Sequence, residues 1–163
     1  MRRRPAAGLT LLELMVALAI VAVLMTLALP SFGSIMARHR LKAAAEQFSM
    51  DLAELQMLAA QRSQTLHVNV SAGAQWCYAL AVAGGCDCRV PQGCQLKTVR
   101  ASDHPGVTLL AGEDLRIDPQ PGGSRGSALL QGSDGARLRV GLSPLGRPKV
   151  CAPGGSVPGF ATC

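Results

Sequence analysis

The sequence predicts an α+β protein, in which one long N-terminal helix packs on a C-terminal head built around an antiparallel β-sheet. An apolar and then amphipathic stretch with helical character runs from Leu9 to about Gln61. Short β-type runs separated by turn residues fill the chain after Ser63. Strands that follow one helix in this way are typical of an α+β head with an antiparallel sheet.

The first half of the predicted helix is apolar enough for a membrane span. From Leu14 to Leu29 the only residue that is not apolar is Thr26. A helix of about 21 residues would reach about 31 Å, close to the ~30 Å of a bilayer's hydrocarbon core. This segment holds one carboxylate, Glu13. An ionisable group at membrane depth is costly and indicates a functional role with a partner. The sequence therefore predicts a transmembrane helix at residues 9–30.

The residues before the apolar segment indicate processing on the cytoplasmic side. Arg2, Arg3 and Arg4 precede the segment, and basic residues hold such an end in the cytoplasm. A secretory signal peptide places its small-residue cleavage site after the apolar region, whereas here the small residue Gly8 comes before it. This order suits a peptidase that works at the inner face of the membrane.

The stretch from Gly8 to Ile20, GLTLLELMVALAI, resembles the prepilin cleavage signature of type IV pilins and type II secretion pseudopilins. The resemblance implies the type IV pilin-like fold, whose long N-terminal helix has a transmembrane half and an amphipathic half. It also implies that a prepilin peptidase removes residues 1–8, cleaving after Gly8, and that Leu9 is then N-methylated. The family usually has Phe where this chain has Leu9. The implied location is the bacterial inner membrane, with a cytoplasmic N-terminus and a periplasmic head, before assembly into a pilus or pseudopilus.

The same resemblance gives Glu13 a role in assembly. In the family this glutamate pairs with the methylated amino terminus of a neighbouring subunit. Opposite charges attract strongly in a low dielectric, while either charge alone is costly there. The alternative is a tolerated surface glutamate that reaches the headgroups. A further alternative is an anchored periplasmic domain that never assembles, but Glu13 and the position of Gly8 argue against it.

Residues 31–62 form the predicted amphipathic helix of the head. The resemblance implies that Pro30 bends a continuous helix at this junction, since an interior proline removes one hydrogen bond. Apolar residues at three- and four-residue steps predict a stripe that packs against the sheet, at Leu41, Ala45, Phe48, Leu52, Leu55 and Ala59. Charged residues are expected on the other faces, at Arg38, Arg40, Lys42, Glu46, Asp51 and Glu54.

Residues 63–163 form the predicted β-rich periplasmic head. Strands are expected at residues 65–70, 76–82, 107–110, 115–117, 128–130 and 138–142. Asp134 and Gly135 predict a tight hairpin between the last two strands. The stretch from Gly84 to Cys94 is too rich in Gly, Cys and Pro for a regular element.

The six cysteines lie beyond the apolar segment, at Cys77, Cys86, Cys88, Cys94, Cys151 and Cys163. An even number in an exported domain predicts up to three disulfides, and six cysteines allow 15 pairings. Cys151 and Cys163 are the most local pair outside the loop. The alternative for Cys86, Cys88 and Cys94 is a zinc site, but no histidine lies nearby and an oxidising compartment favours disulfides. No metal and no other cofactor is expected.

The head resembles the GspH/FimT branch of the pilin superfamily. The similarity rests on the strand with Trp76, the loop after it, and the closing stretch SPLGRPKVC at residues 143–151. The resemblance implies a minor subunit that initiates or caps the fibre, in contact with other pilins or pseudopilins. Some members bind DNA during uptake through a Gly-Arg-any-Arg motif, which Gly146, Arg147 and Lys149 match with Lys in the last place. Lysine keeps the charge but loses the planar fork of arginine.

The charge distribution supports a basic C-terminal region. The net charge of +6 falls to +3 without the three leader arginines, too little by itself to indicate nucleic acid. Residues 101–123 carry −3, however, and residues 124–163 carry +4. Arg137 and Arg139 share one face of a strand by alternation, so with Arg147 and Lys149 they form a candidate site for double-stranded DNA. Few aromatic residues are present for base stacking. The alternatives for these residues are a solvated basic edge or a salt-bridge surface toward a neighbouring pilin. The alternative function is that of a minor pseudopilin of a type II secretion system, which takes part in protein secretion without binding DNA.

No catalytic motif is recognisable. His39, His67 and His104 have no nucleophile or paired carboxylate at a known spacing, and no Gly-rich phosphate loop follows a strand. An enzyme is therefore not expected.

Overall fold

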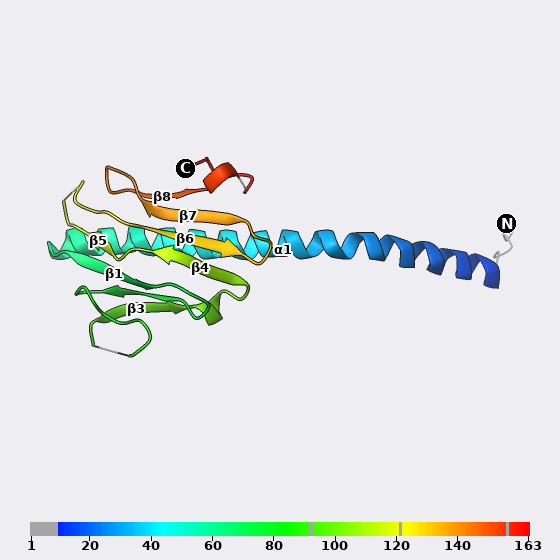
Figure 1. Ribbon diagram of the computed structural model, residues 1–163, viewed down its shortest axis with the longest axis horizontal. Helices are drawn as coiled ribbons and strands as arrows, with labels where there is room; N and C mark the ends of the chain where they lie inside the picture. Colours follow the sequence, from blue (N-terminus) through cyan, green and yellow to red (C-terminus); the bar gives the residue numbers. More distant parts are fainter. Residues whose placement is uncertain (1–9, 92, 121, 156) are drawn as a thin grey trace, which may run out of the picture. The chain divides into compact units, whose positions relative to one another are not determined.

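The computed structural model describes residues 10–91, 93–120, 122–155 and 157–163, without the side chains of residues 27–31. In the described residues after helix α1 (Leu11–Arg62), the regular elements are strands and two short 3-10 turns, η1 (Ala101–Asp103) and η2 (Pro153–Gly155). The strands are β1 (Leu66–Ser71), β2 (Cys77–Ala81), β3 (Gln95–Arg100), β4 (Val107–Gly112), β5 (Leu115–Ile117), β6 (Ser127–Gly132), β7 (Arg137–Leu142) and β8 (Pro148–Cys151) (Figure 1). The chain divides into two compact units, Met1–Ile35 and Met36–Cys163.

The described part of the first unit is helical from Leu11 onward. Thr10 caps this helix, because its Oγ1 accepts a hydrogen bond from the backbone N–H of Glu13 at 3.3 Å. All side chains from Thr10 to Thr26 are exposed. Within the described residues, no helix has a stretch that is both long enough and apolar enough to cross a membrane. Leu9, where the predicted span of residues 9–30 begins, lies outside the described residues.

Helix α1 continues through Pro30. The expectation of one helix that joins the apolar and amphipathic halves is therefore confirmed. The bend at Pro30 stays a prediction.

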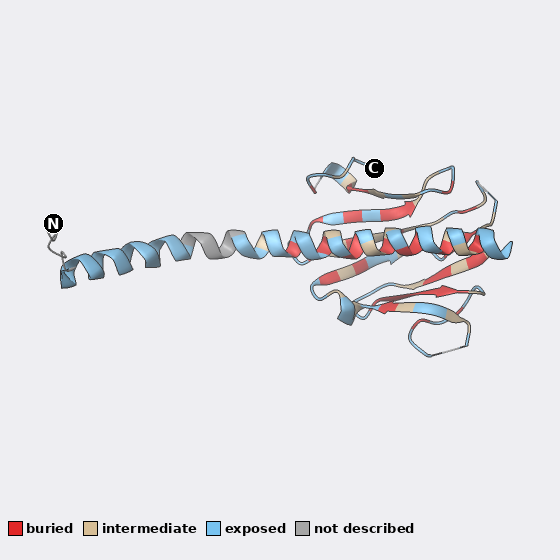
Figure 2. Ribbon diagram, turned by 180° about the vertical axis from the view of Figure 1, so that it is seen from behind, coloured by how far each residue is buried: buried red, intermediate tan, exposed pale blue. Residues whose placement is uncertain are grey.

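In the second unit, the apolar stripe of α1 is buried as its spacing predicts. Leu41, Ala45, Phe48, Leu52, Leu55 and Ala59 are all within 1% of full burial. Figure 2 shows buried residues recurring along the part of α1 that runs with the strands, and these residues share one core with the strands. One residue differs from the expectation, since Asp51 is only 3% exposed although its charge placed it on an outer face.

The head contains two four-stranded antiparallel sheets where one sheet was expected. The first sheet has the order β3-β2-β1-β5 and the second the order β4-β6-β7-β8. Both contribute to one core with α1, for example through Val68 and Ile117 of the first sheet and Leu130 and Leu138 of the second. Strands β3 and β8, which alternation did not reveal, form the ends of the two sheets. The predicted hairpin is present between β6 and β7, where Gly135 has a φ of 83° and donates to the Gly132 carbonyl at 3.0 Å.

Three disulfides cross-link the head. Cys77 pairs with Cys88, Cys86 with Cys94, and Cys151 with Cys163. The last pair is the one that proximity in the sequence favoured. Because Cys86, Cys88 and Cys94 are all used in disulfides, the zinc alternative for the loop is wrong.

Candidate functional site

The N-terminal processing residues lie at the edge of what the structure describes. Gly8 and Leu9, the predicted cleavage and methylation positions, are outside the described residues. Glu13 is described and occupies the first turn of α1 with its side chain exposed. Among the described residues no basic group forms an ion pair with Glu13. Its carboxylate is therefore accessible to a group from outside the chain.

The predicted DNA-binding residues gather on the β7–β8 hairpin. In β7, Arg137 and Arg139 are exposed and alternate with the buried Leu138 and Val140. In β8, the exposed Lys149 pairs with Gly141, two residues beyond Arg139, so it shares the outer face of the sheet with the arginines. Arg137, Arg139 and Lys149 therefore lie on the same outer face of the β7–β8 hairpin.

Arg147 belongs to the turn that joins these two strands. The backbone N–H of Ser143 donates to the Arg147 carbonyl at 2.8 Å, and Ser143 Oγ accepts from the Arg147 N–H at 3.0 Å. Gly146 has a φ of 78°, a value that favours glycine, and its carbonyl accepts a hydrogen bond from the Gln56 side chain of α1. The turn is therefore pinned to the helix, with Arg147 exposed. We call Arg137, Arg139, Arg147 and Lys149 the basic flank.

Contacts with α1 hold the segments around the basic flank in place. The C-terminal segment after β8 is fixed by the Cys151–Cys163 disulfide, by the buried Val157, and by Lys42, whose Nζ donates to the Pro158 carbonyl at 3.0 Å. Lys42 also lies 5.5 Å from the ring centre of Phe160, within cation–π range. The flank thus projects from a fixed surface.

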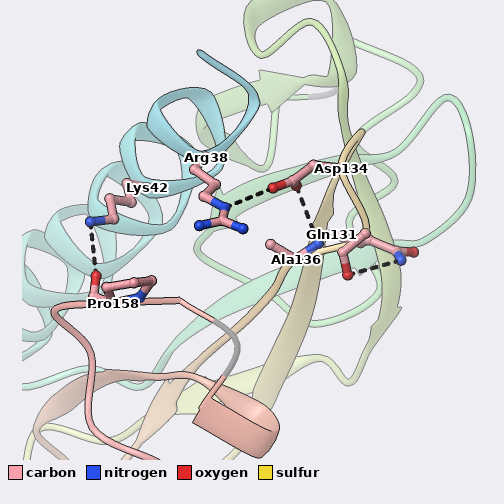
Figure 3. Close-up of polar contacts among 7 residues, drawn as sticks. Arg38, Lys42, Gln131, Asp134, Ala136 and Pro158 are labelled. Atoms are coloured by element: carbon pink, nitrogen blue, oxygen red, sulfur yellow. Dashed lines mark hydrogen bonds and ion pairs between the residues drawn. The ribbon is translucent and has the colours of Figure 1, made fainter. Parts of the chain in front are cut away.

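The acidic residue nearest to the basic flank in the sequence is paired with α1. Asp134 is the one acidic residue in the sequence from 124 to 163, and it forms an ion pair with Arg38 of α1 at 3.0 Å (Figure 3). Asp134 also accepts the backbone N–H of Ala136, which fixes the β6–β7 turn. Among the described residues no acidic side chain forms an ion pair with Arg139, Arg147 or Lys149. Such a cluster of cations suits a polyanion or an acidic protein surface.

A polar network around the buried Asp51 was not predicted from the sequence. Asp51 accepts hydrogen bonds from the Tyr78 hydroxyl at 2.7 Å and from Lys97 Nζ at 2.6 Å. Burial raises the pKa of Tyr78, and the Asp51 charge raises it further. The Tyr78 ring stacks on Phe48, with 4.4 Å between ring centres. This network ties α1 to β2 and β3 and contributes to the fold.

The three histidines occupy different parts of the chain. His39 lies on α1, His67 on β1, and His104 directly after η1. His104 stacks on Trp76 with 6.0 Å between ring centres, and burial lowers its pKa. This stacking gives His104 a packing role.

The chain is similar to known proteins in its N-terminal segment and in its fold. Residues 3–29 match the family model described as "Prokaryotic N-terminal methylation motif". No curated protein matches the sequence. Among solved structures, this one resembles the crystal structure of the type IV minor pilin FimU from Pseudomonas aeruginosa strain PAO1, with a TM-score of 0.55 and 15% sequence identity. That match covers 76% of this chain and 96% of the FimU chain. The long helix followed by antiparallel sheets is the type IV pilin-like fold, and residues 3–29 of the chain carry the N-terminal methylation motif.

Proposed function

We propose that this protein is a minor pilin, a structural subunit that helps to initiate or cap a type IV pilus-like fibre. The observation that carries this proposal is the methylation motif at residues 3–29, joined to a pilin-like head. A subunit of this kind needs no catalytic centre, and we propose that the protein is not an enzyme.

Assembly follows from the N-terminal segment. A prepilin peptidase cleaves after Gly8, Leu9 becomes the methylated N-terminus, and the subunit waits in the inner membrane with its head in the periplasm. The exposed apolar side chains of residues 11–25 then pack against the helices of neighbouring subunits. Glu13 attracts the amino terminus of the adjacent subunit, because a charge pair removed from water is strongly favoured over two separate charges.

A Glu13→Gln variant tests this proposal in the bacterium that produces the protein. The variant keeps the shape of the side chain and removes its charge, so the amount of subunit in sheared fibres should fall by at least about tenfold. The membrane pool should stay unchanged. The matched control is Glu46→Gln, which removes an exposed charge of α1 in the head. Unchanged incorporation of Glu13→Gln would contradict the assembly role.

The basic flank supports a second function, the binding of double-stranded DNA during uptake. Arg137, Arg139, Arg147 and Lys149 lie on one hairpin, and the acidic residue nearest in sequence, Asp134, is paired with Arg38. Binding of this kind would read phosphates and would not depend on base sequence.

Gel-shift titration of residues 36–163 with duplex DNA across a salt series tests the DNA proposal. This fragment suffices because, among the residues whose burial the structure describes, every buried core residue lies at position 37 or beyond. Affinity should fall steeply with salt, and Arg147→Glu/Lys149→Glu should abolish binding. The control is Arg62→Glu/Arg125→Glu, which makes the same charge change at two exposed sites outside the flank. If the wild-type head does not bind at low salt, the alternative gains support, namely a minor pseudopilin of a type II secretion system that acts without DNA.

A further inference from the structure

Two further arginines, Arg89 and Arg100, are brought together by the fold at the β3 end of the first sheet. Arg100 of β3 is the register partner of Cys77 in β2. Cys77 is also bonded to Cys88, which is followed directly by Arg89. Strand pairing on one side and a disulfide on the other therefore place both arginines beside Cys77, although they are far from it in the sequence.

Both arginines line one hollow in the surface, which we call the arginine groove. Its volume is about 440 Å³, and its other walls include Trp76, Cys77, Ala101 and Ser102. The lining of the groove is more apolar than polar overall, and both arginine side chains are exposed. The groove thus combines an apolar floor with two cationic side chains.

The nearby carboxylates are engaged with the backbone. Asp87 accepts the backbone N–H of Arg89 at 2.9 Å, and Asp103 accepts the backbone N–H of Arg100 at 2.8 Å. These contacts fix the backbone of the two arginines. Among the described residues no acidic side chain forms an ion pair with either guanidinium. Each guanidinium can therefore present its planar fork of donors to an oxyanion from outside.

We propose that the arginine groove binds a carboxylate side chain of an acidic and apolar peptide segment on a partner protein. Two guanidinium forks suit a carboxylate, and the apolar floor suits the aliphatic part of the segment that carries it. Nucleic acid fits less well, because a phosphodiester backbone offers no apolar surface. The Trp76 ring is only 1% exposed and provides no face for base stacking.

The arginine groove is separate from the basic flank. The groove lies at β2 and β3 of the first sheet, whereas the flank lies on β7 and β8 of the second. Figure 1 shows β3 and β8 on opposite sides of the head. The head therefore has two basic surfaces, and the groove does not depend on DNA binding by the flank.

The full chain in detergent micelles, titrated with a short peptide, tests the proposal. The probe is an acetylated, amidated tetrapeptide of alternating leucine and glutamate, and the readout is the fluorescence of Trp76, the single tryptophan of the sequence. We expect saturable binding, and no binding of the same peptide with glutamine in place of glutamate. A duplex oligonucleotide should leave the Trp76 signal unchanged.

Substitutions at the arginine groove test whether the change in Trp76 fluorescence comes from peptide bound there. Arg89→Gln/Arg100→Gln should weaken peptide binding by at least about tenfold, since hydrogen bonds to charged groups are lost. Arg62→Gln/Arg125→Gln, the matched control, should bind as wild type does. Cys77→Ala/Cys88→Ala keeps both arginines but releases Arg89 from its position, so this variant should also bind more weakly.

Four results would overturn the proposal. These are no saturable binding of the acidic peptide, equal binding of the glutamine peptide, full binding by Arg89→Gln/Arg100→Gln, and a Trp76 response to the oligonucleotide that the two arginines control. Circular dichroism of each variant checks that the head is folded, so a loss of binding can be assigned to the groove.

Discussion

The two units of the chain differ in whether their apolar residues are buried. In the head, the stripe of α1 that includes Leu41, Phe48 and Leu52 is enclosed by two sheets. In the N-terminal unit, every side chain from Thr10 to Thr26 is exposed, although most are just as apolar. The C-terminal part of helix α1 is therefore packed in a core, whereas the apolar side chains of residues 11–25 in its N-terminal part remain exposed.

This difference indicates that the folding of the head and the assembly of the protein depend on different parts of the chain. The head has its own core and three disulfides, so its stability should not depend on other molecules. The N-terminal unit has apolar surface whose burial would require a bilayer or other subunits, in line with the proposed assembly. Substitutions in the two units should therefore affect different measurements.

The largest expected effect comes from shortening a leucine at the two ends of the same helix. Leu52 is fully buried and Leu18 is 61% exposed. Leu52→Ala should lower the free energy of unfolding by about 2–5 kcal/mol, because it leaves a cavity in the core. Leu18→Ala should change it by less than about 0.5 kcal/mol. Chemical denaturation of the full chain in detergent measures both, and equal losses would contradict the separation of folding from assembly.

A smaller effect is expected from the C-terminal disulfide. Cys151→Ala/Cys163→Ala should reduce the stability of the head by about 2–3 kcal/mol, since it frees a loop of 12 residues. Thermal unfolding measures the loss. The melting temperature of the variant should also depend less on added reductant than that of wild type. If removing this disulfide leaves the melting temperature unchanged, the contacts of Lys42 and Val157 hold the C-terminal segment without it.

The smallest effect is a pH dependence within the head. Hydrogen bonds from Thr65 and then from Arg116 lower the pKa of Asp118. A carboxyl whose folded pKa is lowered adds stability above its unfolded pKa of about 4, and this stability is lost as the pH falls through the folded pKa. Asp118→Asn should cost about 1 kcal/mol at pH 7 and should lose less stability on acidification than wild type does.

Denaturation at a series of pH values checks this last prediction. The control is Glu113→Gln, which removes an exposed carboxylate on the neighbouring loop. An acid-dependent loss in Asp118→Asn as steep as in wild type would show that Asp118 is not the group responsible.

The parts of the fold that were predicted from the sequence are those set by local spacing. Burial of the α1 stripe follows from steps of three and four residues, and Arg137 and Arg139 share a face because side chains alternate in a strand. Strand β3 was missed because only Val99 in it is buried, so it has almost no apolar alternation. Strand β8 was missed because it is short and begins with Pro148.

The features that were missed depend on contacts between distant residues. Asp51 is buried because Tyr78 and Lys97 provide its hydrogen bonds, and no local pattern reveals such partners. The meeting of Arg89 and Arg100 requires both the β2–β3 register and the Cys77–Cys88 pairing. Six cysteines allow 15 complete pairings, and the sequence did not show which of them contains the Cys77–Cys88 bond. These residues could be read from the sequence, but the strand register, the disulfide pairing and the hydrogen-bond partners that bring them together could not.

Cleavage after Gly8 is the first step of the proposed pilin assembly, and the mass of the mature N-terminus reports whether it occurs. The protein would be isolated from the membranes of the bacterium that produces it and analysed by intact-mass and N-terminal fragment spectra. We expect a chain that begins at Leu9 and carries one additional methyl group. A chain that still begins at Met1, or one cleaved after the apolar stretch, would contradict it.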